Sequence, residues 1–352
     1  MVWAHLVSPT NRGEIEHRLL AMKGPRSKFF TGSLLAPAVL FLGTGGLLTT
    51  FGPREPVDLT ARLEAVPDTN LDDWIAEREA EFTDLRDGAQ KEIIWIDPVS
   101  KDRTKFAVVY IHGFSASKQE IRPVPDKLAA GLKANLYFTR LSGHGRDSSA
   151  MAEPSVGDWV HDLDEAIKIG RRIGEQIILV STSTGSSLVA LGLTQEDLAE
   201  NVEAVVFVSP NFKLVAKRAY LLTWPFARQV VPLVIGSERG FEPLNDAHAR
   251  HWTDRYPTVA TMPMAALVEA ASNVPFEQIN VPAFFTYSPK DQVVDPVVTR
   301  AAADRWGGPV QILEVRLQPN DDPSSHIIAG DIASPSQTEP LADALIRWAK
   351  SL

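Results

Sequence analysis

The 352-residue sequence contains no cysteine. Disulfide bonds, thiolate nucleophiles, cysteine-based zinc or iron sites and lipid attachment to a cysteine are therefore excluded. Positive charge is also scarce, because 35 Lys and Arg face 44 Asp and Glu, which gives a formal net charge of −9. Proteins that bind nucleic acids depend on Lys and Arg, so we expect no nucleic-acid partner. The apolar content of 44% is enough to bury a large core in a chain of this length.

Charge is missing altogether from residues 29–51, a run long enough to cross the ~30 Å hydrocarbon core of a membrane as a helix. Basic residues precede it, namely Lys23, Arg26 and Lys28. This arrangement favours a cytoplasmic N-terminus and an exported remainder. A secretory signal has the same pattern, but the small residues 36–38 precede most of the run, so we expect an uncleaved anchor. We expect residues 1–52 to be an N-terminal extension of a membrane-anchored or exported protein; a buried Gly-rich hairpin is the alternative.

After Pro53 short apolar strands alternate with helices. We expect amphipathic helices over 59–86 and strands over 92–96, 106–113, 135–141, 177–180, 204–210, 282–288 and 310–317. The intervening helices are expected over 120–134, 156–174 and from Ser183, and a last one over 339–352. Such alternation predicts an α/β fold whose mainly parallel sheet is covered by helices on both faces.

Residues 213–273 break the alternation, because they contain no good strand and many large aromatic side chains. We interpret them as a helical cap inserted between the two parts of the core, 53–212 and 274–352. The cap would lie over the carboxyl edge of the sheet, where ligands bind in such folds. Its candidate substrate-binding residues are Trp224, Phe226 and Trp252. A surface excursion without function is the alternative.

Six hydroxyl side chains crowd residues 181–187, directly after a predicted strand. A strand that turns sharply into a helix around a nucleophile needs small residues two positions before and after it. Only a turn centred on Ser183 meets this need, with Ser181 and Gly185 at the small positions. Taken alone, the pattern also fits the N-cap of a helix.

A serine becomes a nucleophile when a histidine takes its proton and a carboxylate orients that histidine. In a sheet of this kind the acid follows the serine along the chain and the histidine comes last. Asp291 follows the strand 282–288, and His326 follows the strand 310–317. We therefore predict a triad of Ser183, Asp291 and His326.

Other side chains compete for these roles. Asp295 is an alternative acid, although it also suits the start of a helix before Pro296, and Asp321 and Asp322 are expected to be solvated turn residues. The other histidines do not follow the last strand, so His326 takes its role from its place in the set of three.

An ester carbonyl under attack also needs donors for its developing negative charge. The strand 106–113 ends in His112-Gly113-Phe114, and the Phe114 N–H is one candidate donor. The second is the N–H of Thr184, at the start of a helix. A plain turn is the alternative for 112–114.

Together these residues resemble the α/β-hydrolase superfamily, and within it the capped serine hydrolases of the monoacylglycerol lipase, lysophospholipase and serine aminopeptidase (S33) kind. The matching stretches are 112–114, the turn LSGHGR at 141–146, the elbow at 181–185, D-x-V-V at 291–294 and His326. Ser142 and Ser181 stand where the family usually has proline and glycine. The resemblance spans about residues 90–352 and implies an α/β-hydrolase fold with a serine hydrolase activity.

We therefore expect a serine carboxylesterase or lipase-like hydrolase that acts on a small-molecule ester, medium-chain or monoacylglycerol-like, without cofactor or metal. An aminopeptidase of the same fold is the first alternative, with Glu238, Glu242 and Asp246 as candidates to hold a substrate amine. A non-catalytic binding protein is the second. Membrane contact is expected through residues 29–51.

Overall fold

The computed structural model describes residues 52–67 and 69–352 of the chain. The predicted anchor over residues 29–51 lies outside the described residues. In the part of the chain that is described, no helix combines the length and the apolar character needed to cross a membrane.

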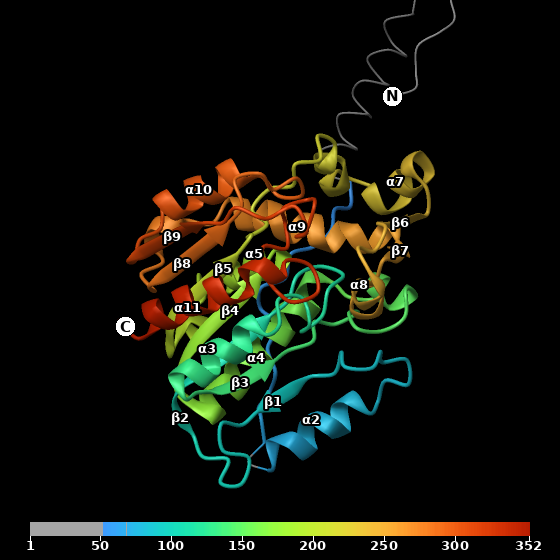
Figure 1. Cartoon of the computed structure of the whole chain (residues 1–352). Helices are drawn as coiled ribbons and strands as arrows, with labels where there is room; N and C mark the ends of the chain where they lie inside the picture. The colour runs from blue at the N-terminus through green and yellow to red at the C-terminus, as the bar shows by residue number, and fades with distance from the viewer. Residues whose placement is uncertain (1–51, 68) are drawn as a thin grey trace, which may run out of the picture. The chain divides into compact units, whose positions relative to one another are not determined.

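A seven-stranded sheet runs through the described domain, in the order β1-β3-β2-β4-β5-β8-β9 (Figure 1). The strands are β1 (Glu92–Ile94), β2 (Thr104–Ile111), β3 (Asn135–Phe138), β4 (Gly174–Thr182), β5 (Val202–Val208), β8 (Ala283–Tyr287) and β9 (Val310–Glu314). β1 pairs antiparallel with β3, and every other pair in this sheet is parallel. The predicted α/β fold with a mainly parallel sheet is therefore confirmed.

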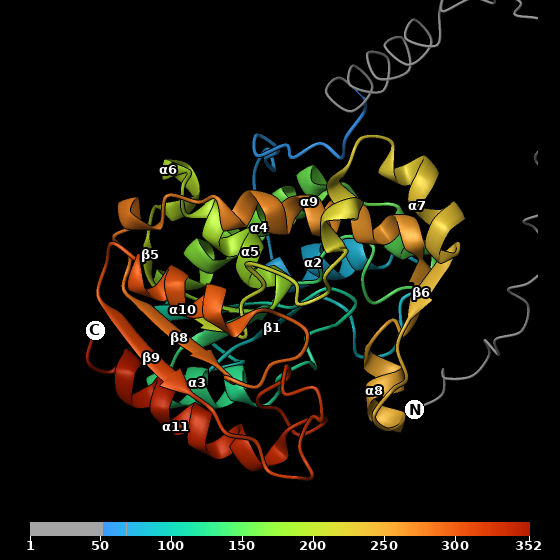
Figure 2. The ribbon, with the colours of Figure 1, turned by 90° about the horizontal axis from the view of Figure 1, so that it is seen from above.

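Helices cover both faces of the sheet, as Figure 2 shows from above. One face carries α3 (Val124–Leu132) and α11 (Thr338–Ala349). The other carries α4 (Val156–Ile173), α5 (Thr184–Gly192), α9 (Thr261–Ser272) and α10 (Pro296–Asp304). The remaining helices outside the cap are α2 (Leu71–Glu79), α6 (Glu196–Ala199), η1 (Ser149–Ala152), η4 (Phe276–Gln278) and η5 (Pro335–Gln337).

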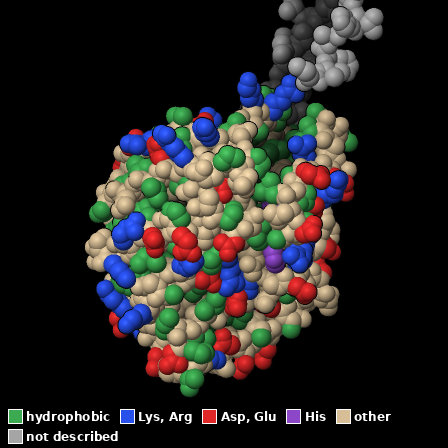
Figure 3. Space-filling view, viewed as in Figure 1, with side chains coloured by type: hydrophobic (Ala, Val, Ile, Leu, Met, Phe, Trp, Pro, Cys, Tyr) green, Lys and Arg blue, Asp and Glu red, His purple; other side chains and the backbone are tan. Residues whose placement is uncertain are grey.

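The segment between β5 and β8 contains the predicted cap. It comprises η2 (Ala219–Thr223), α7 (Ala227–Ile235), β6 (Glu238–Gly240), α8 (Asp246–His251), β7 (Arg255–Pro257) and η3 (Thr258–Ala260), followed by α9, which packs against α5. The expectation of no strand here is wrong in one place, because β6 and β7 form an antiparallel pair. The two strands have only three residues each, with the sequences ERG and RYP. Neither therefore shows the alternating apolar pattern by which a strand is predicted. Part of the surface of the domain appears in Figure 3.

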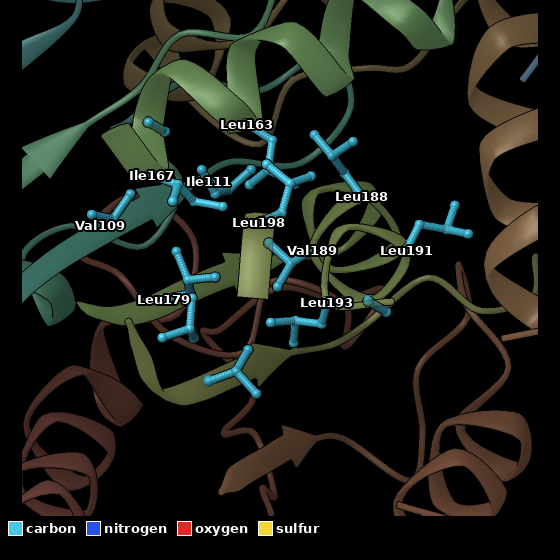
Figure 4. Packing of buried hydrophobic residues seen from close by; sticks show 14 of the residues in the cluster. Val109, Ile111, Leu163, Ile167, Leu179, Leu188, Val189, Leu191, Leu193 and Leu198 are labelled. Atoms are coloured by element: carbon cyan, nitrogen blue, oxygen red, sulfur yellow. The ribbon is translucent and has the colours of Figure 1, made fainter. Parts of the chain in front are cut away.

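Two apolar cores lie on the two faces of the sheet. Alternate side chains of β2 belong to one core or the other. Ala107, Val109 and Ile111 point into the core beneath α4 and α5, where Figure 4 shows the packing. Phe106, Val108 and Tyr110 point into the core beneath α3 and α11. Successive side chains of a strand face opposite ways, so a continuous apolar run is what a strand covered on both sides requires.

The predicted helices over 59–86 are only partly present. α2 begins after Asn70, whose side chain accepts a hydrogen bond from the Asp72 N–H, and it ends at Glu79. Residues 59–67 form no helix. They are tied to α4 instead, because the Leu63 N–H donates to the Asp164 carboxylate at 2.7 Å and the Leu63 carbonyl accepts from Lys168. Tertiary contacts have replaced the helical hydrogen bonds here.

Candidate active site

Ser183 occupies a sharp turn between β4 and α5. Its backbone has φ 50° and ψ −119°, a conformation that costs a residue with a Cβ about 1–3 kcal/mol. The turn is held by two hydrogen bonds of 3.0 Å, from the Ser183 N–H to the Val208 carbonyl and from the Asn211 N–H to the Ser183 carbonyl. Gly185 allows close packing, because a Cβ there would lie 2.5 Å from the His112 oxygen. This is the turn that the spacing of small residues predicts.

The neighbouring hydroxyls are hydrogen-bonded elsewhere. Ser181 Oγ bonds to Ser186 Oγ at 3.1 Å and to the Val206 carbonyl at 3.2 Å. Other partners are Tyr110 for Thr182, the Asn211 side chain for Thr184 and the Asn211 carbonyl for Ser187. Of the six hydroxyls, only that of Ser183 is hydrogen-bonded to a histidine of the described residues. The choice of Ser183 thus agrees with the geometry.

Ser183, His326 and Asp291 form a chain of hydrogen bonds. His326 Nε2 lies 3.0 Å from Ser183 Oγ, and His326 Nδ1 lies 2.8 Å from Asp291 Oδ2. The other carboxylate oxygen of Asp291 accepts the N–H groups of Val293 and Val294 at 2.8 and 2.9 Å. With Nδ1 protonated and bonded to Asp291, Nε2 is free to accept the Ser183 proton. The structure thus brings together the three residues predicted from chain order.

Asp322 anchors the loop that carries His326. Its Oδ2 accepts the N–H groups of His326 and Ile327 at 2.9 and 2.8 Å and the Ser324 hydroxyl at 2.6 Å. Asp321 accepts the Gln318 N–H at 2.7 Å. Both carboxylates are buried, so the expectation that they are solvated is wrong. They satisfy backbone donors that this loop would otherwise bury without partners.

Asp295, the alternative acid, lies at a helix start. Its side chain accepts the Val297 N–H at 3.1 Å as the N-cap of α10, and it pairs with Lys213 at 3.0 Å. The structure gives it no hydrogen bond to His326. Asp291 is therefore the acid that the geometry favours.

The electrostatic surroundings of His326 favour the charged imidazolium. Burial lowers the pKa of His326, but the hydrogen bond and negative charge of Asp291, with the charges of Glu120 and Asp322, outweigh it and raise the pKa above its usual value. A base of raised pKa holds a transferred proton better. The site is thus arranged to stabilise a positive charge on His326.

The predicted oxyanion donors flank Ser183. Gly113 lies against it, since a Cβ there would come within 3.0 Å of Ser183 Cβ. His112 braces this turn: its Nδ1–H donates to the Gly113 carbonyl at 2.8 Å, and its Nε2 accepts the Leu141 N–H at 3.1 Å. The N–H groups of Phe114 and Thr184 donate no hydrogen bond to residues 52–67 or 69–352. Both backbone donors are therefore available.

Glu120 is a site residue that the sequence analysis missed. It is buried, and its Oε2 accepts the Gly113 N–H at 2.8 Å and the Tyr110 hydroxyl at 2.9 Å. Burial raises the pKa of Glu120 to about 7, although these hydrogen bonds and the nearby His326 oppose the rise. Glu120 thus secures the turn that carries Phe114. In the sequence it looked like a polar residue at a helix start, and no signal distinguished it.

The three predicted cap residues lie in different surroundings. Trp224 is half exposed and packs against Tyr220, with ring centroids 5.8 Å apart. Phe226 donates its backbone N–H to the Pro53 carbonyl at 2.8 Å, and Trp252 is buried against His248. No ring contact or hydrogen bond recorded for the described residues joins any of the three to Ser183. Their substrate-binding role stays a prediction.

A different aromatic residue of the cap reaches the site. The Tyr256 ring packs edge-on against Phe114, with centroids 5.2 Å apart. Phe114 also contacts His144 and Trp159. As for metals, no group of three or more His, Asp or Glu side chains in the described part of the chain is arranged to hold an ion.

Comparison with known proteins agrees with this geometry. The model of the alpha/beta hydrolase family matches residues 108–329, more than half of the chain. The chain belongs to the alpha/beta hydrolase family. This confirms the resemblance at the level of the fold family, and the matched residues of this hydrolase include Ser183, Asp291 and His326. A search of curated proteins finds no match.

Several solved structures share the fold at low sequence identity. One belongs to the metagenome-derived lipolytic enzymes LipS and LipT, with a TM-score of 0.62 and 16% identity over 76% of this chain and 100% of that one. Another is a soluble variant of monoglyceride lipase from Saccharomyces cerevisiae, with a TM-score of 0.55 and 11% identity over 85% of this chain and 99% of that one. A third is the monoacylglycerol lipase of Paleococcus ferrophilus, with a TM-score of 0.50 and 17% identity over 74% of this chain and 98% of that one.

Proposed function

We propose that this protein is a serine carboxylesterase or lipase-like hydrolase that cleaves carboxylic esters through an acyl-enzyme on Ser183. The observation that carries the proposal is the hydrogen-bonded chain from Ser183 through His326 to Asp291. The fold adds support, because lipolytic enzymes and monoacylglycerol lipases are among the solved structures that share it.

In the first half of the reaction His326 Nε2 takes the proton from Ser183 Oγ as that oxygen attacks the ester carbonyl carbon. The carbonyl oxygen becomes negatively charged and receives the N–H groups of Phe114 and Thr184. Asp291 holds the imidazolium in place. The tetrahedral intermediate then collapses, His326 gives its proton to the departing alkoxide, and the acyl group remains on Ser183 as an ester.

Water completes the cycle. His326 removes a proton from water as its oxygen attacks the acyl carbon, and the same two N–H groups stabilise the second oxyanion. Collapse breaks the bond to Ser183 Oγ, which takes the proton back from His326 and releases the carboxylic acid.

A lipophilic acyl or alcohol group, such as a medium-chain ester or monoacylglycerol, is the substrate class that we propose. The support is the aromatic pair of Phe114 and Tyr256, which places apolar surface next to the candidate oxyanion turn. We further propose on sequence grounds that residues 29–51 anchor or export the protein, with the catalytic domain outside the cytoplasm.

Labelling with a fluorophosphonate probe tests the nucleophile. We expect wild type and Ser186→Ala to be labelled and Ser183→Ala to remain unlabelled. Labelling of Ser183→Ala, or no labelling of wild type that is correctly folded, would contradict the mechanism.

The substrate class requires a second measurement. p-Nitrophenyl esters of increasing chain length should be hydrolysed, with kcat/KM highest for medium chains, and aminoacyl anilides should be poor substrates. The reverse preference would favour the aminopeptidase alternative, in which Glu238, Glu242 or Asp246 would hold the substrate amine. Glu238 is exposed on β6, and nothing in the described contacts directs it towards Ser183.

A further inference from the structure

An apolar surface of the cap faces solvent. We name it the cap face and define it by six exposed side chains, Tyr220, Trp224, Val230, Leu233, Val234 and Ile235. Leu233 and Val234, which are adjacent, are 87% and 70% exposed. Contiguous exposed apolar surface of this kind marks an interaction site more often than a solvated one.

The cap face combines Tyr220 and Trp224, in and next to η2, with the exposed part of the apolar side of α7. The inward side of α7 consists of Ala227 and Val231, which pack against Met262. Val230, Leu233 and Val234 follow one another at positions i, i+3 and i+4, so they project from one side of the helix. α7 therefore has one broad apolar side, of which only the strip of Ala227 and Val231 has a partner within the described domain.

Basic side chains border the cap face. Residues 213–240 contain five basic residues, Lys213, Lys217, Arg218, Arg228 and Arg239, against one acid, Glu238. The net charge of this segment alone is +4 (5 − 1), but Lys213 pairs with Asp295 and Arg228 with Glu55, so within the described domain its unpaired positive charge comes from Lys217, Arg218 and Arg239. Lys217 and Arg218 are exposed and form no ion pair with the described residues. Figure 3 shows basic side chains near the top of the view, and apolar side chains scattered over the whole visible face.

The chain also enters the described domain beside the cap face. The Pro53 carbonyl accepts the Phe226 N–H at 2.8 Å, and Arg54 donates to the Thr223 carbonyl at 2.9 Å. Glu55 holds Arg228 through two hydrogen bonds of 2.6 and 2.7 Å. The uncharged run 29–51 ends two residues before Pro53, a covalent distance of at most about 7 Å. A membrane that receives this run would therefore be within reach of the cap.

We propose that the cap face docks on the surface of an anionic lipid bilayer. α7 lies in the interface, with Leu233 and Val234 in the outer hydrocarbon, Tyr220 and Trp224 at the headgroups, and Lys217 and Arg218 on the lipid phosphates. Apolar exposure and positive charge on one surface are what such a bilayer recognises. The inference is independent of the reaction at Ser183.

Site-specific labelling of the full-length protein tests this inference, and the absence of native cysteine gives each variant a single attachment point. Leu233→Cys carries an environment-sensitive fluorophore, and the protein is reconstituted into vesicles of phosphatidylcholine with phosphatidylglycerol. The matched control is Val99→Cys, because Val99 is 92% exposed in the loop between β1 and β2. Iodide quenches the label from water, and nitroxide-bearing lipids quench it from the bilayer.

We expect the label at position 233 to be quenched by nitroxide lipids and shielded from iodide, and the label at position 99 to behave in the opposite way. Changing Lys217 and Arg218 to Gln should lower the ratio of docked to free cap by about fivefold for each cation removed. Equal iodide quenching at both positions would overturn the proposal, even if residues 29–51 span the bilayer. Shielding from iodide without nitroxide quenching would overturn it too, because residues 29–51 or a second copy would then cover the cap face.

Discussion

Replacing Glu120 by Gln should remove a large part of the pH dependence of stability between about pH 4.5 and 7. Burial raises the pKa of Glu120 from 4.5 to about 7. Between these values the native protein keeps a proton that the unfolded chain releases, so the free energy of unfolding falls as pH rises. The difference of about 2.5 pH units corresponds to about 3 kcal/mol, which is lost in full above pH 7. Gln stays neutral and can still accept the Gly113 N–H.

Urea unfolding of wild type and Glu120→Gln at pH values from 5 to 9 measures this effect. The variant should gain stability relative to wild type as pH rises, by about 3 kcal/mol in total, and the difference should level off above pH 7. Glu175→Gln, at an exposed position, controls for the loss of one surface carboxylate. A difference between wild type and Glu120→Gln that is the same at pH 5 and pH 8 would refute the reasoning.

The activity of the same variant provides an independent readout. The negative charge of Glu120 helps to raise the pKa of His326, and a neutral Gln does not. In the proposed mechanism His326 must be unprotonated to act as the base, so the acid limb of kcat/KM for ester hydrolysis should move to lower pH in Glu120→Gln over the range above about pH 7, where the Glu120 of wild type is charged. An acid limb at the wild-type pH would mean that Glu120 exerts no electrostatic influence on the base.

Three further substitutions test the site. Ser183→Gly should abolish ester hydrolysis but raise the free energy of unfolding in urea by about 1 kcal/mol, because glycine adopts a φ of 50° without strain; a loss of stability would show that no strain is stored there. Ser181→Gly should keep most of the activity but lose about 1–2 kcal/mol of stability with its buried hydrogen bonds, and unchanged stability would contradict this. His144→Gln should weaken acid sensitivity, since burial lowers the pKa of His144 from 6.5 to about 4. As pH falls from 6.5 to 4, the unfolded chain binds a proton that native His144 does not bind, which lowers the free energy of unfolding of wild type by about 3 kcal/mol. Identical acid titrations of wild type and His144→Gln, followed by circular dichroism, would refute this.

The triad could be predicted because its positions depend on features that are local in the sequence. A strand buried on both faces is a run of apolar residues, and β4 and β8 contain such runs, whereas β9 is an edge strand that is only partly buried. In parallel strands the segments that follow meet at one edge of the sheet, so Ser183, Asp291 and His326 could be grouped from chain order alone. The register of the sheet and the hydrogen-bond distances then follow from packing and could not be predicted.

The supporting residues could not be predicted, because their burial depends on distant parts of the chain. Glu120 and Asp322 are charged residues in polar stretches, and such residues usually lie in solvent. Each is buried because it satisfies backbone N–H groups of a turn that folds over it, those of Gly113 in one case and of His326 and Ile327 in the other. The β6-β7 pair was missed for a related reason, since exposed backbone pairing leaves no apolar pattern.

Ser181 replaces the glycine that the family usually has at this position, and the structure accommodates its side chain. A glycine at this position would leave the floor of the Ser183 turn without a side chain, whereas the Ser181 hydroxyl is fully buried and bonds to Ser186 on α5 and to the Val206 carbonyl on β5. Ser186 in turn donates to the Ser181 carbonyl at 3.0 Å. These bonds tie β4, β5 and α5 together directly below the strained residue. Because strain at Ser183 persists only where neighbouring contacts enforce it, the serine in place of glycine helps to hold the turn that carries Ser183.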